Sequence, residues 1–455
     1  VATGGAAAME AARHWTADWL DRCDAWDSVA WRADVTGNRL FAWIEHADAL
    51  AGRREDAALR ARLLASIARQ ARHLARVATR EIPGVRRLAA LRGLVAALAA
   101  LDGERRLERA LVRLERELSA QILPDGGHVE RSPAAQLAAL RYLIDARAAL
   151  RARQAEVPGA LQSAIDRAAP MLRFFRHGDG MLGLFNGANE GEGGFVDLVL
   201  ARAEAKGRPP ISAPYAGFQR LHAGRTLVIA DTGVPPAPGL DGDAHAGTLS
   251  FEMSHGRERL IVNCGGYHGA NADWRSVARA TAAHSTLVVA DTNSSEIRAD
   301  GGLGRRPTHV PCERAEDGGS QWLAASHDGY HPPFGLTHAR QLFLAGDGDD
   351  LRGEDRLTGR AGQSFAIRFH LHPQVQASLA QDGATALLRL PSGTGWRLRA
   401  QGAVMSLAES VYLGGGELRK SQQVLLDGHV GSAGATVKWA LRREAKKPPE
   451  DTEGS

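Results

Sequence analysis

The sequence lacks any apolar run that would serve as a membrane helix. None of its segments approaches the roughly 18 consecutive apolar residues that such a helix needs. Cysteine is also scarce: Cys23, Cys264 and Cys312 lie far apart and form no Cys-x-x-Cys pair, which excludes a disulfide framework. The first residues lack the charged segment and apolar core of a secretory signal. We therefore expect no membrane span, and the sequence leaves the compartment open.

An excess of either charge is missing too. The 56 Lys and Arg residues barely exceed the 52 Asp and Glu residues, which argues against a protein that wraps nucleic acid by net charge. The basic residues are mostly arginines, and an arginine-lined cleft would still receive an acidic substrate. At 455 residues the chain is longer than one hydrophobic core usually supports, so we expect two domains.

The two halves of the chain differ in their apolar periodicity. Over residues 15–175, apolar side chains recur every three or four positions in segments rich in Ala, Leu and Arg, which predicts successive amphipathic helices. After residue 210, short alternating runs separated by Gly, Asp and Asn predict antiparallel strands. We expect an all-α domain over 1–205, an antiparallel β-sandwich over 206–442 and a disordered tail over 443–455.

A first polar cluster lies in the segment ILPDGGHVERSP, residues 122–133, between two predicted helices. Ser132 and Pro133 are typical of a helix start, so His128, Glu130 and Arg131 would lie at the mouth of that helix. An imidazole, a carboxylate and a guanidinium beside helix amides form a good anion site. The alternative is that these are solvated loop residues.

A second cluster surrounds the runs TLSFEM, RLIVNCGG and AAHSTLVVAD. His245 precedes the first run, Asn263 ends the second and His284 opens the third, so an antiparallel sheet could bring the three side chains to one end. Two histidines and a third donor are the minimum for zinc, although Asn is a poor zinc ligand. The alternative is a pair of hydrogen-bonded structural histidines.

Two further segments of the predicted sandwich are rich in histidine. The first, SHDGYHPPFGLTHARQLFL, carries Tyr330, His338 and Arg340, which are candidate substrate contacts. The second, IRFHLHP, places His370 and His372 on one strand face. That face would be either a cleft wall or a polar sheet surface, and we favour the surface for His372.

Taken together and in this order, the motifs DAHAGTLSFEM, LIVNCGGY, AAHSTLVV, GEDRL and RFHLHP resemble those of the heparinase II/III-like polysaccharide lyases. PDGGHVERSP resembles the motif of their helical domain. The resemblance implies an α/α toroid, incomplete at its amino-terminal end, followed by a large antiparallel β-sandwich. It also implies cleavage of uronate-containing glycans by β-elimination, often beside a structural zinc.

The resemblance also implies roles for single residues. His128 matches the position that neutralises the uronate carboxylate, and Arg131 would help to bind the sugar acid. Glu130 and Asn186 are further candidate substrate contacts. Tyr267, together with His128 or His245, would carry out the proton transfers that β-elimination requires.

Some positions depart from the family pattern. His245 and His284 match metal-binding positions, but Asn263 stands where the family has Asp, which weakens the expectation of one structural zinc. Asp243 replaces the first histidine of the motif, which is usually assigned to catalysis. Leu182 stands where the alignment places the catalytic Tyr.

Three functions compete on these observations. We favour a divergent polysaccharide lyase acting on an acidic polysaccharide, because polar groups in three separate segments would be costly to bury without a use. The second is an acidic-glycan-binding protein without elimination chemistry, and the third is a structural helical protein with a β cap. We expect no nucleic-acid partner, a bacterial protein of the periplasm or cytoplasm, and an oligomeric state that includes a dimer among the options.

Overall fold

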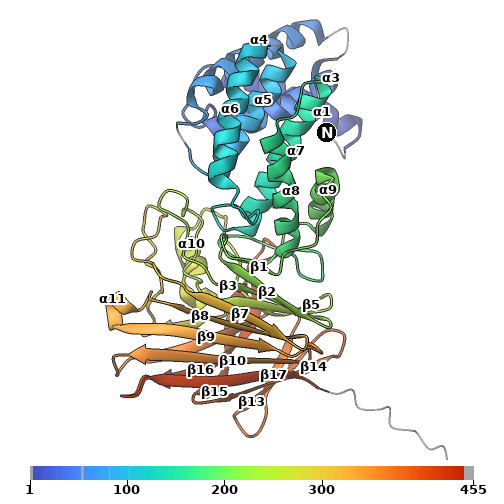
Figure 1. Ribbon diagram of the computed structural model, residues 1–455. Coiled ribbons are helices and arrows are strands. Elements are labelled where there is room, and N and C mark those ends of the chain that lie inside the picture. The colour runs from blue at the N-terminus through green and yellow to red at the C-terminus, as the bar shows by residue number, and fades with distance from the viewer. Residues whose placement is uncertain (1–3, 53–55, 81, 102, 445–455) are drawn as a thin grey trace, which may run out of the picture. The chain divides into compact units, whose positions relative to one another are not determined.

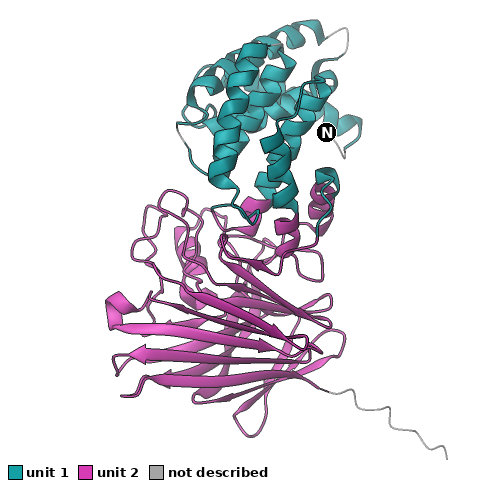
Figure 2. Cartoon of the chain, viewed as in Figure 1, with its two compact units in different colours: residues 1–129, 137–169, 201–207 teal, residues 130–136, 170–200, 208–455 magenta. Residues whose placement is uncertain are grey.

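The computed structural model describes residues 4–52, 56–80, 82–101 and 103–444. The chain forms two compact units, shown in Figure 2. Unit 1 comprises residues 1–129, 137–169 and 201–207, and unit 2 comprises residues 130–136, 170–200 and 208–455. Part of the helical half of the sequence therefore packs with the strands. The predicted tail begins where the last strand ends, at Arg443, and its residues 445–455 lie outside the described part.

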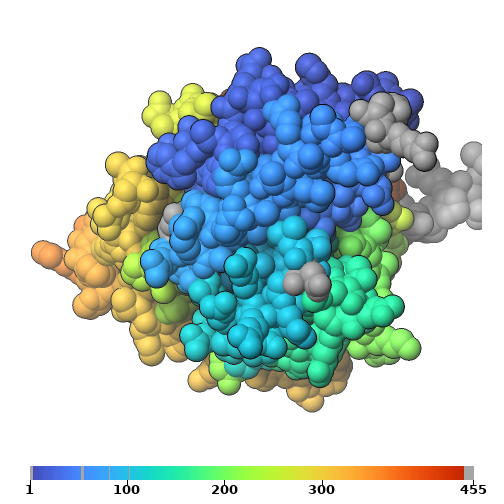
Figure 3. All heavy atoms as spheres, turned by 90° about the horizontal axis from the view of Figure 1, so that it is seen from above, coloured from blue at the N-terminus to red at the C-terminus, as the bar shows by residue number. Residues whose placement is uncertain are grey.

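Helices fill the first half of the chain, as the periodicity predicts (Figure 1). Leu and Ala side chains supply most of the buried apolar surface of these helices. Viewed from above, the side chains of unit 1 pack into a continuous surface (Figure 3). No helix in the described ranges is long and apolar enough to cross a membrane. The helices are α1 (Ala6–Arg22), α2 (Ala33–Glu45), α3 (Ala47–Ala51), α4 (Ala57–Val77), α5 (Val85–Ala100), α6 (Glu104–Gln121), α7 (Pro133–Ala152), α8 (Gly159–Phe174) and α9 (Gly193–Ala203).

Helix α5 is the centre of unit 1, because nearly all of its residues from Leu88 to Ala99 are buried. It approaches α2 closely where two glycines face each other. A Cβ atom on Gly93 would lie 2.3 Å from the carbonyl oxygen of Gly37. The absence of both side chains thus permits a helix contact that any larger residue would push apart.

Unit 2 contains two antiparallel sheets, which in the described residues have nine and eight strands. The nine-stranded sheet has the order β1-β2-β3-β4-β5-β11-β16-β15, with β6 paired to β11. Its strands are β1 (Ser212–Ala213), β2 (Phe218–Ala223), β3 (Thr226–Asp231), β4 (Phe251–His255), β5 (Glu258–Val262), β6 (Leu287–Val289), β11 (Ser364–Leu371), β15 (Val404–Tyr412) and β16 (Arg419–His429). Short helices α10 (Ala272–Arg279) and α11 (His331–Phe334) lie in the connections.

The eight-stranded sheet has the order β12-β13-β14-β17-β10-β9-β8-β7. Its strands are β7 (Cys312–Asp317), β8 (Ser320–His327), β9 (Leu336–Leu344), β10 (Asp350–Gly359), β12 (Gln376–Leu379), β13 (Thr385–Arg389), β14 (Gly395–Gln401) and β17 (Ala435–Arg443). Alternate residues of both sheets form one buried apolar cluster. Within it, Trp439 stacks on Phe251 at 5.7 Å and meets Phe369 edge-on at 5.0 Å, measured between ring centroids. The predicted antiparallel sandwich is confirmed.

Replacing Gly93 with Ala should destabilise unit 1. The new methyl group would collide with the backbone of Gly37, and overpacking of this kind costs about 1–3 kcal/mol of unfolding free energy. Urea unfolding followed by circular dichroism measures the change. Gly159→Ala is the matched control, because a Cβ at that helical glycine would meet nothing within 4 Å. Equal stability of the Gly93→Ala variant and the wild type would contradict the proposed close contact.

Candidate functional site

His245 and His284 lie together in unit 2, as the sequence predicted. Nδ1 of His245 is 3.0 Å from Nε2 of His284, and the rings meet edge-on. Nδ1 of His284 lies 2.8 Å from the carbonyl oxygen of Ala280. Because that oxygen can only accept, Nδ1 of His284 carries the proton, and Nε2 accepts from Nδ1–H of His245. Nε2 of His245 is then the unprotonated nitrogen of its own ring.

Burial keeps this histidine pair neutral. Desolvation lowers the pKa of His284 to about 4. Desolvation also lowers the pKa of His245 to well below its usual value, and the neighbouring His284 and Arg279 lower it further.

Asn186 fixes the backbone of His245 from a separate loop. Its side-chain oxygen accepts the N–H of His245 at 3.0 Å, and its amide nitrogen donates to the carbonyl of Arg131 at 2.9 Å. Asn186 adopts a positive φ of 46°, a conformation that Asn tolerates better than most residues. The loop before helix α9 therefore positions the histidine pair.

The predicted zinc ligands do not form a convincing metal site. Asn263 accepts the backbone N–H of Ser285 at 3.0 Å through its side-chain oxygen, and the two imidazoles bond to each other. Among the described residues, no group of three or more His, Cys, Asp or Glu side chains is placed to hold a metal ion. These donors fit hydrogen-bonded structural histidines better than zinc, so we assign no chemical step to a metal.

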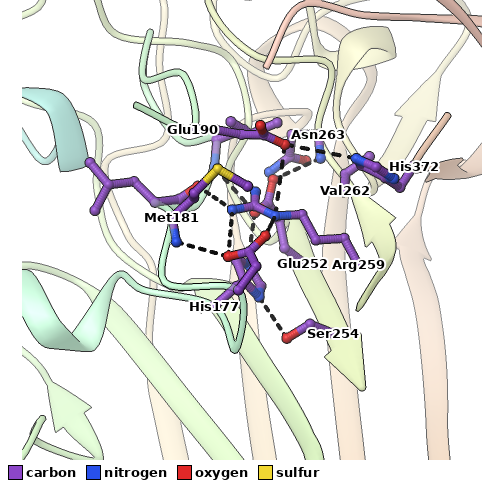
Figure 4. A network of polar contacts seen from close by, with 12 residues as sticks. His177, Met181, Glu190, Glu252, Ser254, Arg259, Val262, Asn263 and His372 are labelled. Carbon is purple, nitrogen blue, oxygen red and sulfur yellow. Dashed lines mark hydrogen bonds and ion pairs between the residues drawn. The ribbon is translucent and has the colours of Figure 1, made fainter. Parts of the chain in front are cut away.

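A buried carboxylate, Glu252 on β4, connects the loop after α8 to the sheet (Figure 4). One of its oxygens lies 3.0 Å from Nε2 of His177 and accepts the N–H of Leu184 at 3.1 Å. The other oxygen accepts the N–H of Asn263 at 2.8 Å. Nδ1 of His177 lies 2.9 Å from the hydroxyl of Ser254. Burial lowers the pKa of His177, although Glu252 acts in the opposite direction.

A second carboxylate, Glu190, lies in the same network (Figure 4). It accepts a hydrogen bond from the hydroxyl of Tyr412 and lies 3.8 Å from Nε2 of His372 and 3.9 Å from Nε of Arg259. Burial raises the pKa of Glu190, but His372, Arg259 and Tyr412 outweigh it and lower the pKa to about 2. Arg259 also pairs with Asp179 at 2.7 Å. His372 thus belongs to this network rather than to the polar surface that the sequence favoured.

Comparison with known proteins identifies the family. A model described as "Heparinase II/III-like, C-terminal" matches residues 205–440. The chain belongs to the heparinase II/III-like family. It is 35% identical over 446 residues to FtsZ-localized protein C of Caulobacter vibrioides, an alignment that covers 94% of this chain and 77% of that protein.

Solved structures agree with this assignment. A crystal structure of heparinase III superposes with a TM-score of 0.77 at 14% identity, covering 97% of this chain and 74% of that one. A heparan sulfate lyase from Pedobacter heparinus gives 0.71 at 16% identity, covering 99% and 75%. At these identities the similarity establishes the fold. The predicted fold class, a helical region followed by an antiparallel β-sandwich, is confirmed.

Leu182 and Asp243 stand where the family resemblance implies a catalytic tyrosine and a catalytic histidine. Leu182 is buried in unit 2, where its N–H donates to the carbonyl of Glu190 and its carbonyl accepts from Arg259. Asp243 is exposed beside Gly187, close to the histidine pair. Tyr267 is partly exposed and lies 6.3 Å from the ring of Trp274. The expected role of Tyr267 in proton transfer stays a prediction.

Arg131 was expected to help bind a sugar acid. Its guanidinium is instead buried and bonded to groups of unit 2. It donates to the carbonyls of Ala216, Gly217 and Val234 and pairs with Asp231. Its role is to join three loops, and it has no donor directed to a sugar acid. Asn186 is likewise buried between two backbone groups.

Tyr330, His338 and Arg340 also lie in the core instead of at a substrate surface. The hydroxyl of Tyr330 donates to the carbonyl of Leu287. Asp355 holds Nε2 of His338 and Nε of Arg340, each at 2.8 Å. Burial raises the pKa of Asp355, but Arg340 and His338 reverse this and hold it far below its usual value. Substrate contact was therefore the wrong interpretation of these three side chains.

His128 belongs to unit 1, where it is buried and its Nε2 lies 3.0 Å from the side-chain oxygen of Gln121. Burial lowers its pKa to about 3. Glu130 is partly exposed and belongs to unit 2. The expected roles of His128 in neutralising a uronate carboxylate and of Glu130 in substrate contact stay predictions.

Sequence reasoning missed His177, Glu190, Glu252 and Arg259. His177 and Glu190 come from one loop after α8, whereas Glu252 and Arg259 lie in the quoted runs TLSFEM and RLIVNCGG on β4 and β5. The signal that was available is the glycine-rich run after α8, residues 178–194, which indicated an unusual loop without indicating its partners.

Replacing Glu190 with Gln should weaken the pH dependence of stability. Its folded-state pKa of about 2 lies below the unfolded-state value of about 4.3. The carboxylate therefore stabilises the wild type fully above the unfolded-state value, and this contribution is lost as the pH falls towards 2. Between about pH 5 and pH 3, unfolding free energy from urea titrations should fall more steeply in the wild type than in Glu190→Gln.

The control for this experiment is Glu313→Gln, which changes an exposed strand glutamate of the same unit. It should reproduce the wild-type slope. If Glu190→Gln also reproduces it, Glu190 is not a source of acid sensitivity.

Proposed function

We propose that this protein is a divergent member of its family that binds an acidic polysaccharide and does not cleave it by the family's route. The observation that carries the proposal is the replacement of both implied proton-transfer groups. Leu182 is buried at the tyrosine position and Asp243 stands at the first histidine position. This reverses the order of preference drawn from the sequence.

The physical argument concerns the base that elimination requires. Removing the proton next to a uronate carboxylate needs a base matched to the working pH, together with neutralisation of the carboxylate. His245 is the remaining histidine of the motif, and burial makes it a weak base. Its Nδ1 is also committed to His284. A weak base argues against elimination. It favours a protein that keeps the family's fold in order to bind the polysaccharide.

Elimination by a rearranged site is the alternative. Nε2 of His245 is unprotonated, and Tyr267 in the neighbouring loop is partly exposed. Such a site would use Tyr267 as the acid, and it predicts that the phenol is essential for turnover.

One experiment separates the two. The protein is incubated with a panel of uronate-containing polysaccharides, and the ultraviolet absorbance of an unsaturated uronate is followed while retention on the same immobilised glycans is measured. We expect retention without new absorbance. A heparan sulfate lyase serves as the positive control. New absorbance that Tyr267→Phe abolishes would overturn the proposal in favour of a lyase, and absence of retention would exclude binding.

A second candidate function comes from the relative that matches most of the chain. FtsZ-localized protein C is 35% identical along 94% of this chain, compared with 14% and 16% for the two lyase structures. Its name states that it is localised with FtsZ. We propose the same localisation for this protein, and a scaffold that binds without catalysis is compatible with it.

A fluorescent fusion of this chain, expressed in cells with labelled FtsZ, tests this localisation. The two signals should overlap, and the fluorescent protein alone should not follow FtsZ. A diffuse distribution of the fusion at normal expression would contradict the candidate function.

A further inference from the structure

The outer face of the eight-stranded sheet carries a row of aromatic and cationic side chains. Trp322, Phe343, Arg352, Ala440 and Arg399 are successive cross-strand neighbours on β8, β9, β10, β17 and β14. The residues that alternate with them point into the buried core of the sandwich. The row therefore faces away from the core.

This row lines a groove of about 590 Å³. Ala440 lies between Arg352 and Arg399 in the row, and its small side chain leaves space between these two cations. A volume of this size lies within the ~300–1,000 Å³ typical of small-molecule sites. We call it the outer-sheet groove.

Aromatic side chains form one side of the groove, where they are accessible and are held by contacts with one another and with an arginine. The rings of Trp322 and Phe343 lie 4.9 Å apart between centroids, and the guanidinium of Arg352 lies 5.4 Å from the centre of the Phe343 ring. Trp322 is 40% exposed. An exposed ring of this kind offers a flat apolar surface to the C–H face of a sugar ring.

The charged side of the groove is mainly cationic. Arg352, which pairs with Asp350 at 2.7 Å, lines it with Arg399, Lys438 and one carboxylate, Glu354. That carboxylate is already paired with Arg356 at 2.6 Å and lies 3.7 Å from Lys438. Arg399 donates its Nε to the hydroxyl of Thr385 at 3.3 Å. Within residues 103–444, no acceptor is bound to the Nη groups of Arg399, so they can hold an anion bidentately.

We propose that the outer-sheet groove binds a uronic-acid-containing oligosaccharide. A sugar ring stacks on Trp322 and Phe343, and its carboxylate pairs with Arg399. The ligand class rests on the proposed function, whereas the location is new and lies on the outer sheet face. A second copy of the same face is disfavoured, because a twofold contact would bring these cations against each other.

Isothermal titration of the full chain tests the groove. The probes are a galacturonic acid hexasaccharide and a heparan sulfate-derived hexasaccharide, with a neutral cellohexaose as the uncharged comparison. Trp322→Ala and Arg399→Gln should each weaken binding of the acidic probes by roughly fivefold or more, since each removes a central contact. Arg419→Gln is the matched control, because Arg419 is an exposed strand arginine on the other sheet, and it should bind like the wild type.

The outcomes separate the groove from the proposed function. If the wild type binds the acidic probes and both groove variants bind equally well, the groove is refuted and the proposed function stands. If the wild type binds no acidic saccharide, the groove proposal and the proposed function are both refuted. If the variants change the oligomeric state in sedimentation without changing saccharide binding, the face is an interface between copies and the proposal is overturned. Unfolding midpoints near that of the wild type exclude a folding defect.

Discussion

The burial of Glu252 is the constraint on which the site in unit 2 depends. This carboxylate is fully buried and accepts from the backbone N–H groups of Leu184 and Asn263, with His177 beside it. A buried charge without such partners would cost several kcal/mol, so the glycine-rich loop has to lie where it supplies them. Asn186 in that loop then holds the backbone of His245. One desolvated carboxylate thereby fixes the loop and, through it, the histidine pair.

The same polar interior explains what holds the loops of unit 2 in place. The groups that hold the loops, such as Arg131 with Asp231 and Asp355 with Arg340, form buried networks in which each partner is needed to offset the desolvation of the other. Leu182 and Asp243, which stand where the resemblance places catalytic groups, lie outside these two ion pairs.

The spacing of apolar residues in the sequence was sufficient to predict the architecture of helices followed by strands. Apolar residues recur every three or four positions in the first half of the chain and at every second position in the second half. The first spacing places apolar side chains on one face of a helix and the second places them on one face of a strand, so the change of spacing located the helices and strands. The pairing of His245 with His284 was also predictable, since both residues flank strands of one sheet. Tyr330, His338 and Arg340 were misinterpreted, because a polar residue on an inward strand face has the same sequence pattern as a site residue. Whether a polar residue on such a face is buried depends on how the opposite sheet packs against it.

The sequence by itself determined the division into a helical half and an antiparallel sandwich. This division follows from local spacing and residue type, which a linear chain displays directly. The tertiary structure decided which polar side chains meet: Glu252 with His177, Glu190 with Tyr412, and Trp322 with Phe343 and Arg352 across neighbouring strands. Such pairings depend on strand register and loop packing between residues that are distant in the chain. No local pattern encodes them, because the desolvation that makes each partner necessary exists only in the folded protein.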